Sequence, residues 1–186
     1  MIKPIGSDEL MPLFVYDTDE HDALSKEAEG LPSIVISSAA AGNAVMMGGG
    51  YFTPLTGYMN VADAVSVAET MKTTSGQFFP VPILNLVESA DGIEIGSRIA
   101  LRDPNVDGNP VIAIQQVEGI ETVSAEQMAL MTEKVYRTTD MEHPGVKAFN
   151  TVGNIAISGP IKVLNFSYFN TEFPDTFRTA VEIRNE

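Results

Sequence analysis

The glycine-rich segment Met47-Gly48-Gly49-Gly50 is the part of this sequence whose composition best suits phosphate binding. Glycine loops bind phosphate because their backbone N–H groups can approach the oxygens closely. A P-loop also requires Lys followed by Ser or Thr after the glycines, and no such pair follows here. Gly48 and Gly50 match a dinucleotide-binding fingerprint, but Thr53 stands at its third glycine position and no βαβ crossover follows. We therefore interpret the segment as a tight turn that uses positive φ angles.

A second segment, Asp103-Pro104-Asn105-Val106-Asp107-Gly108, resembles the first half of an EF-hand calcium loop. That loop needs a bidentate Glu at its twelfth position, which is Ile114 here. Because Ile114 belongs to an apolar run, the pattern favours a hairpin turn over a calcium site.

The two histidines of the chain, His21 and His143, offer little further chemistry. The sequence contains no His-Glu-x-x-His pair and no histidine beside a candidate serine nucleophile. Asp140, Glu142 and His143 are close enough in sequence to share a cation, but the pattern favours a loop of polar residues before Pro144-Gly145 over a metal site. The sequence therefore predicts no catalytic residue, no cofactor-binding residue and no metal ligand in this chain.

The charge and composition narrow the class of partner. With 11 Lys and Arg against 25 Asp and Glu, the net charge is −14, which disfavours nucleic acid and anionic membranes. Cysteine is absent, which excludes disulfides and thiolate zinc sites. No apolar run is long enough to span a bilayer, and the N-terminus lacks the apolar stretch of a signal peptide. We expect a cytoplasmic protein whose acidic charge keeps it soluble, with no nucleic-acid or membrane partner.

The elements expected in the first half of the chain are short. In order they are a surface helix over 23–29 that ends at Gly30, a strand over 33–37, a small-residue loop over 39–50 and a helix over 61–71. Asn60 is the expected N-cap of the last helix, whose apolar residues recur every three or four positions. Gly76 lies beyond its end.

From residue 79 to 164 the sequence is typical of β-structure with one helix. The expected strands cover 81–87, 93–95 after an Asp91-Gly92 hairpin turn, 97–102, 111–114, 155–157 and 161–164, the last two divided by Gly159-Pro160. Ser124 and Gln127 form a capping box at the start of a helix that reaches Tyr136. Many short strands separated by turns predict a mixed α/β (α+β) fold with a compact barrel or curled sheet and helices outside.

The last residues have a different pattern. Pro174 is expected to open a helix in which Phe177, Ala180, Val181 and Arg184 recur at helical spacing. An amphipathic helix needs something against which its apolar face can pack, and we expect no later partner for this stripe. The pattern indicates that the tail from about Phe166 onward is less ordered than the barrel or packs against a neighbouring molecule, in a chain that continues into a longer protein.

Five segments, in family order, resemble the single-chain ATP sulfurylases (sulfate adenylyltransferases). Gly50–Asn60 is similar to their G-x-F-S-P-L-x-G-F-M segment, Phe79–Ile83 to their P-x-P-I strand, Asp140–Val146 to their D-x-x-H-P-G-V loop, Ser158–Ile161 to their G-G-P-I/V turn, and Phe173–Arg184 to the helix that leads into their catalytic domain. Thr53 replaces the usual serine, and Tyr51 and Tyr58 stand at aromatic or apolar positions.

The resemblance implies a PUA-like small β-barrel with accessory helices over residues 1–165. It also implies that residues 166–186 are a linker and the first helix of a truncated catalytic domain. In the family the next domain carries Q-T-R-N-P, H-x-x-H and G-R-D-H motifs, none of which occurs here. The parent enzyme would interconvert ATP and sulfate with adenylyl sulfate and pyrophosphate, using ATP with Mg²⁺, while this chain would bind no cofactor and be inactive alone.

The partners implied are the missing C-terminal catalytic domain and further copies in a homo-oligomer. The loop containing Asp140, His143, Pro144 and Gly145 is a candidate for a domain or subunit interface, with a simple structural turn as its alternative. Two other functions stay open at this point: a stand-alone PUA-like binding module, for example for RNA, and a subunit-assembly module. The acidic charge disfavours RNA, because backbone contacts require a basic face.

Overall fold

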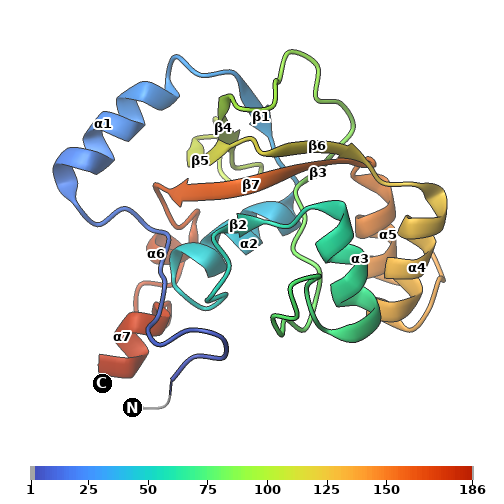
Figure 1. The fold of residues 1–186 in the computed structure, drawn as a ribbon. Coiled ribbons are helices and arrows are strands. Elements are labelled where there is room, and N and C mark those ends of the chain that lie inside the picture. The colour runs from blue at the N-terminus through green and yellow to red at the C-terminus, as the bar shows by residue number, and fades with distance from the viewer. Residues whose placement is uncertain (1–2, 186) are drawn as a thin grey trace.

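The computed structural model describes residues 3–185, which form one curled sheet with helices on both of its faces (Figure 1). The helices are α1 (Thr18–Ala28), α2 (Ser38–Gly48), α3 (Val61–Thr70), α4 (Ala125–Tyr136), α5 (Pro144–Thr151), α6 (Phe169–Glu172) and α7 (Ala180–Asn185). The strands are β1 (Ser33–Val35), β2 (Gly57–Tyr58), β3 (Leu86–Val87), β4 (Arg98–Arg102), β5 (Val111–Gln116), β6 (Gly119–Thr122) and β7 (Ile155–Val163). The predicted mixed α/β fold with a curled sheet is confirmed.

Strand β7 organises the sheet, because it pairs with β2, β3, β5 and β6, all antiparallel. Two strands divided by Gly159-Pro160 were predicted here, which is wrong: residues 155–163 are one strand. Gly159 has a φ of 133°, and a Cβ at this position would lie 2.1 Å from the carbonyl oxygen of Gln116. Glycine therefore lets the strand curl at this point while staying paired.

The rest of the sheet extends from β5 to β4 and then to β1, which runs parallel to β4. The predicted strands over 97–102 and 111–114 are confirmed as β4 and β5, and residues 103–109 form the turn between them. The predicted strand over 81–87 is shorter, since only Leu86–Val87 pair with β7. The strand over 93–95 is wrong: the turn at Gly92 exists, with a φ of 77°, but no strand pairs with the residues after it.

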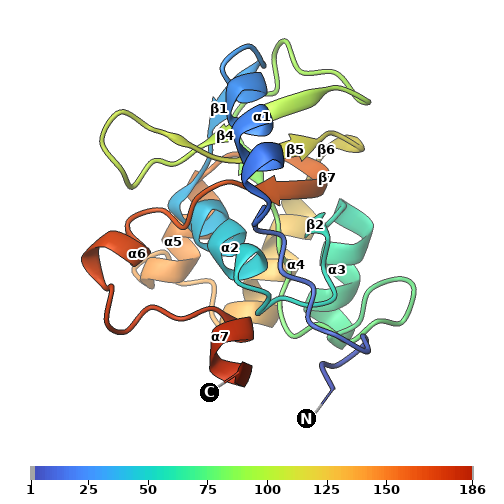
Figure 2. The same cartoon turned by 90° about the vertical axis from the view of Figure 1, so that its left-hand side faces the viewer.

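Residues 39–50 were predicted to be a loop, which is also wrong, because they form most of helix α2. Ser37 caps the helix, since its side chain accepts a hydrogen bond from the Ala40 N–H at 3.1 Å. Alanine is the best helix former, and Ala40, Ala41 and Ala44 are completely buried. Their small side chains let α2 pack closely against β5 and β7 in the middle of the molecule (Figures 1 and 2). Burial, rather than glycine content, thus decides the structure of this segment.

Two helix starts are confirmed as predicted. Asn60 caps α3 by accepting a hydrogen bond from the Asp63 N–H at 2.8 Å. Ser124 and Gln127 form both hydrogen bonds of the capping box at the start of α4. Helix α4 packs between α3 and α5, and the three helices gather at one side of the molecule (Figure 1).

The core lies on both faces of the sheet. The larger cluster fills the space between the sheet and helices α2, α3 and α4, and the smaller one lies between α1 and the sheet. The residues of the smaller cluster are Val15, Leu24, Ala28, Ala100, Ile114 and Leu164. Helix α1 is also fastened by the ion pairs Glu20–Lys162 and Glu27–Arg98. Within residues 3–185, none of the helices has the length and apolar character needed to cross a membrane.

The tail differs from its prediction. No helix begins at Pro174; the last helix, α7, begins at Ala180, after a capping box in which Thr179 and Glu182 exchange side-chain and backbone hydrogen bonds. No later partner was expected for the stripe of Phe177, Ala180 and Val181, but the structure covers part of it with earlier residues: Ala180 is buried, and its N–H donates to the Gly49 carbonyl at 2.8 Å. The ring centroid of Phe177 lies 5.3 Å from that of Phe166, and Phe177 packs against the larger core cluster.

Candidate docking surface

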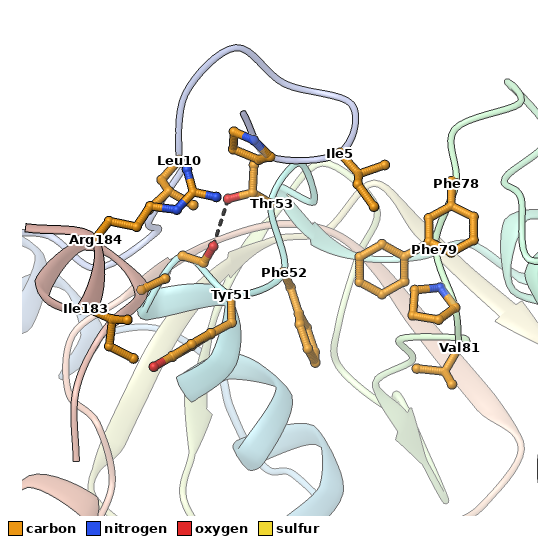
Figure 3. Close-up of a pocket in the computed structure, with 14 residues that line it drawn as sticks. Ile5, Leu10, Tyr51, Phe52, Thr53, Phe78, Phe79, Val81, Ile183 and Arg184 are labelled. Atoms are coloured by element: carbon orange, nitrogen blue, oxygen red, sulfur yellow. Dashed lines mark hydrogen bonds between the residues drawn. The ribbon is translucent and has the colours of Figure 1, made fainter. Parts of the chain in front are cut away.

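An open, largely apolar pocket of about 490 Å³ lies where four segments meet: the N-terminal residues, the loop after α2, residues 78–81 and helix α7. Figure 3 shows Ile5, Phe78 and Phe79 on one side of it and Tyr51 and Ile183 on the opposite side. The lining residues are Pro4, Ile5, Leu10, Gly50, Tyr51, Phe52, Thr53, Phe78, Phe79, Pro80, Val81, Ala180, Ile183 and Arg184. Helix α7, which forms one wall of the pocket, and helix α5, which begins in the predicted interface loop, lie on opposite sides of the molecule (Figure 1).

The loop after α2 is held in place by glycine and by a hydroxyl group. Gly50 has a φ of 82°, as the predicted turn requires, whereas Gly48 ends the helix and Gly49 has an ordinary φ of −74°. The Thr53 hydroxyl donates to the Gly50 carbonyl at 2.8 Å and accepts from the Met11 N–H at 2.9 Å. Thr53 therefore keeps the hydroxyl of the serine it replaces, and that hydroxyl ties the N-terminal segment to the loop.

The same loop holds the tail. The Tyr51 hydroxyl donates to the Arg178 carbonyl at 2.7 Å, and the Ala180 N–H donates to the Gly49 carbonyl at 2.8 Å. Partial burial, and secondarily the nearby Glu182 carboxylate, raise the pKa of the Tyr51 phenol above its ordinary value. The tail is thus anchored to the loop at two points, at Arg178 just before α7 and at Ala180, the first residue of the helix.

The surface around the pocket exposes large apolar side chains. Ile5 is 64% exposed, Ile183 52%, Tyr51 and Phe78 40% each, and Val81 38%. We call these five residues the docking surface. The Thr53 and Tyr51 hydroxyls are both engaged within the protein, so these five side chains offer apolar contact, with the Arg184 guanidinium as the charged group of the pocket lining. A contiguous exposed patch of this kind is typical of an interaction site rather than of a catalytic one.

A second hollow, of about 570 Å³, joins two of the family-like segments. Residues 55–60 and 158–160 both line it, and β2 pairs there with β7. A Cβ on Gly57 would lie 2.0 Å from the Gly159 carbonyl oxygen, so glycine is needed for the two backbones to meet. The Glu121 carboxylate in this hollow accepts a hydrogen bond from the Val61 N–H at 3.1 Å. This hydrogen bond fixes the start of α3.

The predicted interface loop has a local structural role at each of its residues. An Asp140 carboxylate oxygen accepts from the Glu142 N–H at 3.0 Å, and His143 Nδ1 accepts from the Val146 N–H at 3.3 Å, capping α5. Pro144 is the first residue of that helix, where proline is favoured. Gly145 leaves room for Tyr136, whose Cε1 would lie 2.7 Å from an added Cβ. Helix α5 was missed from the sequence, although a capping residue followed by proline is a start signal.

The remaining candidate groups are also placed by the structure. Asp103 is buried, and one carboxylate oxygen accepts from the Asn105 N–H at 2.8 Å, within the β4–β5 turn predicted in place of a calcium loop. The Nε2 atom of His21 lies 2.7 Å from the Leu164 carbonyl oxygen and ties α1 to the end of β7. Between residues 3 and 185 no three His, Cys, Asp or Glu side chains are grouped closely enough to hold a metal ion.

Comparison with known proteins agrees with this fold. Residues 2–166 match the model of the PUA-like domain family. Proteins named sulfate adenylyltransferase from Allochromatium vinosum and from the Riftia pachyptila sulfur-oxidizing endosymbiont are 67% and 63% identical to this chain over all 186 residues. The alignments cover 47% and 42% of those proteins, so the chain spans about half the length of the relatives it matches.

A solved structure, described as a hexameric APS kinase from Thiobacillus denitrificans, has the same fold. It matches with a TM-score of 0.71 at 22% identity, over 100% of this chain and 31% of that one. At this identity the match bears on the fold alone. The chain therefore belongs to the PUA-like domain family, and it corresponds to the N-terminal part of its sulfate adenylyltransferase relatives.

Proposed function

We propose that this chain is the N-terminal, non-catalytic domain of a sulfate adenylyltransferase. The complete enzyme would interconvert ATP and sulfate with adenylyl sulfate and pyrophosphate. Support comes from the identity of 67% to a protein of that name, over less than half of its length. The part of the enzyme that carries the chemistry would be the half that this chain lacks.

The hydrogen bonding of the glycine segment after Met47 is the observation that best supports the non-catalytic role. Adenylyl transfer requires cations and hydrogen-bond donors fixed around phosphate oxygens. The Gly49 N–H donates to the Val45 carbonyl at 2.9 Å and the Gly50 N–H to the Met47 carbonyl at 3.1 Å. Since the Tyr51 N–H also donates within the fold, to Met46 at 3.0 Å, these amides are engaged and do not form a phosphate cradle.

We further propose the division of the chain expected from its sequence. Residues 1–165 would be the PUA-like domain, and residues 166–186 the connection to the catalytic domain. ATP and Mg²⁺ would bind to the catalytic domain, while this chain would hold no cofactor and work in the cytoplasm. The anchoring of α7 by Tyr51 and Gly49 supports a connection that leaves the domain in a fixed direction.

An activity assay tests the non-catalytic role. The purified chain is supplied with adenylyl sulfate, pyrophosphate and Mg²⁺, and ATP is measured by luminescence across the fractions of a sizing column. We expect no ATP formation above background in the fractions that contain the chain. ATP formation that follows the chain through the column would overturn the proposal, because it would place the catalytic centre in these residues.

A further inference from the structure

We infer that the docking surface, formed by Ile5, Tyr51, Phe78, Val81 and Ile183, is covered in the complete enzyme by the C-terminal half that follows this chain. The inference rests on the proposed function, and it names the partner of the surface described above. The occupant is an apolar part of that second half, not a small ligand or a second copy of the domain.

The position of the surface supports this occupant. Helix α7 contributes Ala180, Ile183 and Arg184 to the pocket, so the last described helix is itself one wall of it. The relatives contain about as much chain again beyond the part that aligns here. The residues that follow α7 in such a protein leave from the rim of the pocket, and an adjacent domain is the nearest source of covering side chains.

The hydrogen bonds and ring packing that hold the docking surface in place also support an apolar protein partner. Its segments are fixed before any partner arrives, because Thr53 ties the N-terminal residues to the loop and Tyr51 ties the loop to the tail. The Phe52 and Phe79 rings pack edge to face, with centroids 5.6 Å apart, beneath the exposed side chains. Figure 3 shows the exposed groups arranged around this rigid base. A surface whose segments are already held in place binds an apolar partner with a smaller ordering cost than a flexible one.

Amide hydrogen exchange on two proteins tests the inference. One is the isolated chain, and the other is a full-length chimera in which this chain replaces the equivalent N-terminal residues of the Allochromatium vinosum relative. We expect the amides of residues 50–53, 78, 79 and 81 to exchange at least about tenfold more slowly in the chimera. Residues 91–97 form a turn region that does not line the pocket, and they should exchange equally in both proteins.

Matched variants of the chimera identify the side chains responsible. Phe78→Ser should return the exchange of residues 50–53 towards the rate in the isolated chain, and Ile183→Ser is the second variant should the first fail to fold. Ile95→Ser is the control, because Ile95 is 65% exposed but does not line the pocket. Variants at both sites that leave the exchange of residues 50–53 unchanged would overturn the inference.

Three results would contradict the inference while leaving the proposed function standing. The first is equal exchange of residues 50–53, 78, 79 and 81 in the isolated chain and in an active chimera. The second is a concentration-dependent dimer of the isolated chain, detected by sedimentation, that protects these residues as fully as the chimera does. The third is protection in the isolated chain by a co-purified small molecule, detected by native mass spectrometry.

Discussion

Replacing Tyr58 with Phe removes one hydroxyl group from the core, at a position where the family-like segment carries an aromatic residue. The Tyr58 side chain is 3% exposed, and its hydroxyl donates to the Ala40 carbonyl of α2 at 2.8 Å. A hydrogen bond of this kind contributes about 1 kcal/mol to the free energy of unfolding. At neutral pH, Tyr58→Phe should therefore lower that free energy by about 1 kcal/mol.

At alkaline pH the effect should reverse in sign. Burial raises the pKa of the Tyr58 phenol far above its ordinary value of 10.0, so the folded protein keeps this proton while the unfolded chain releases it. The contribution of Tyr58 to the free energy of unfolding of the parent protein is therefore fully present below about pH 10. Above that pH the free energy of unfolding falls by about 1.4 kcal/mol per pH unit. The Tyr58→Phe variant has no phenol to ionise here and lacks this loss. The free energies of unfolding of the two proteins should therefore be equal at about pH 10.6.

Urea unfolding followed by circular dichroism between pH 7 and roughly 11.5 measures both parts of this prediction. The pKa values of Tyr16, Tyr51 and Tyr136 are also raised by burial, but these residues are present in both proteins and cancel in the difference. A difference between the two proteins that stays constant with pH would show that the Tyr58 phenol is not buried as described. A variant more stable than the parent at pH 7 would refute the role of the hydrogen bond to Ala40.

Two further pairs of substitutions test α2 and α5, two helices that were not predicted from the sequence. In α2, Gly42→Ala should stabilise the protein by up to about 1 kcal/mol, because the new methyl group would meet no heavy atom within 4 Å beyond its own helix backbone and chain neighbours. Gly48→Ala, at the other end of the same helix, should lower the free energy of unfolding by about 1–3 kcal/mol, because its Cβ would lie 2.9 Å from Val163 Cγ1. Equal effects of the two substitutions in urea unfolding would contradict the placement of α2 against β7. In α5, His143→Ala should lose about 1 kcal/mol of stability with the helix cap, whereas His143→Asn, which can still accept the Val146 N–H, should lose much less. Thermal melting compares these two variants, and an equal loss in both would argue against capping by His143.

Local sequence signals predicted the parts of the fold that depend on local interactions. Asn60 and the Ser124–Gln127 box each form hydrogen bonds within one helical turn, so their residue types alone indicate where α3 and α4 begin. The turn at Gly50 was predicted for the same reason, since its positive φ is a property of one residue. The family resemblance supplied the overall architecture, which periodicity left as a barrel or a curled sheet.

The errors lie where long-range packing decides the structure. Helix α2 has a loop-like composition, and it is helical because its alanines are buried against β5 and β7. Helix α7 begins late because the Thr179–Glu182 capping box fixes its start, a sequence signal that was overlooked. The docking surface was not predictable, because its residues come from four segments that only the fold brings together.

Sulfate adenylyltransferase activity of the chimera tests the proposed function most directly. In it, this chain supplies the N-terminal domain and the Allochromatium vinosum relative supplies the remaining half. We predict ATP formation from adenylyl sulfate and pyrophosphate at a kcat/KM within about tenfold of the relative's own, a difference of less than about 1.4 kcal/mol in transition-state stabilisation. A chimera that unfolds cooperatively, and is therefore folded, but forms no ATP above background would contradict the assignment of this chain as the N-terminal domain of such an enzyme.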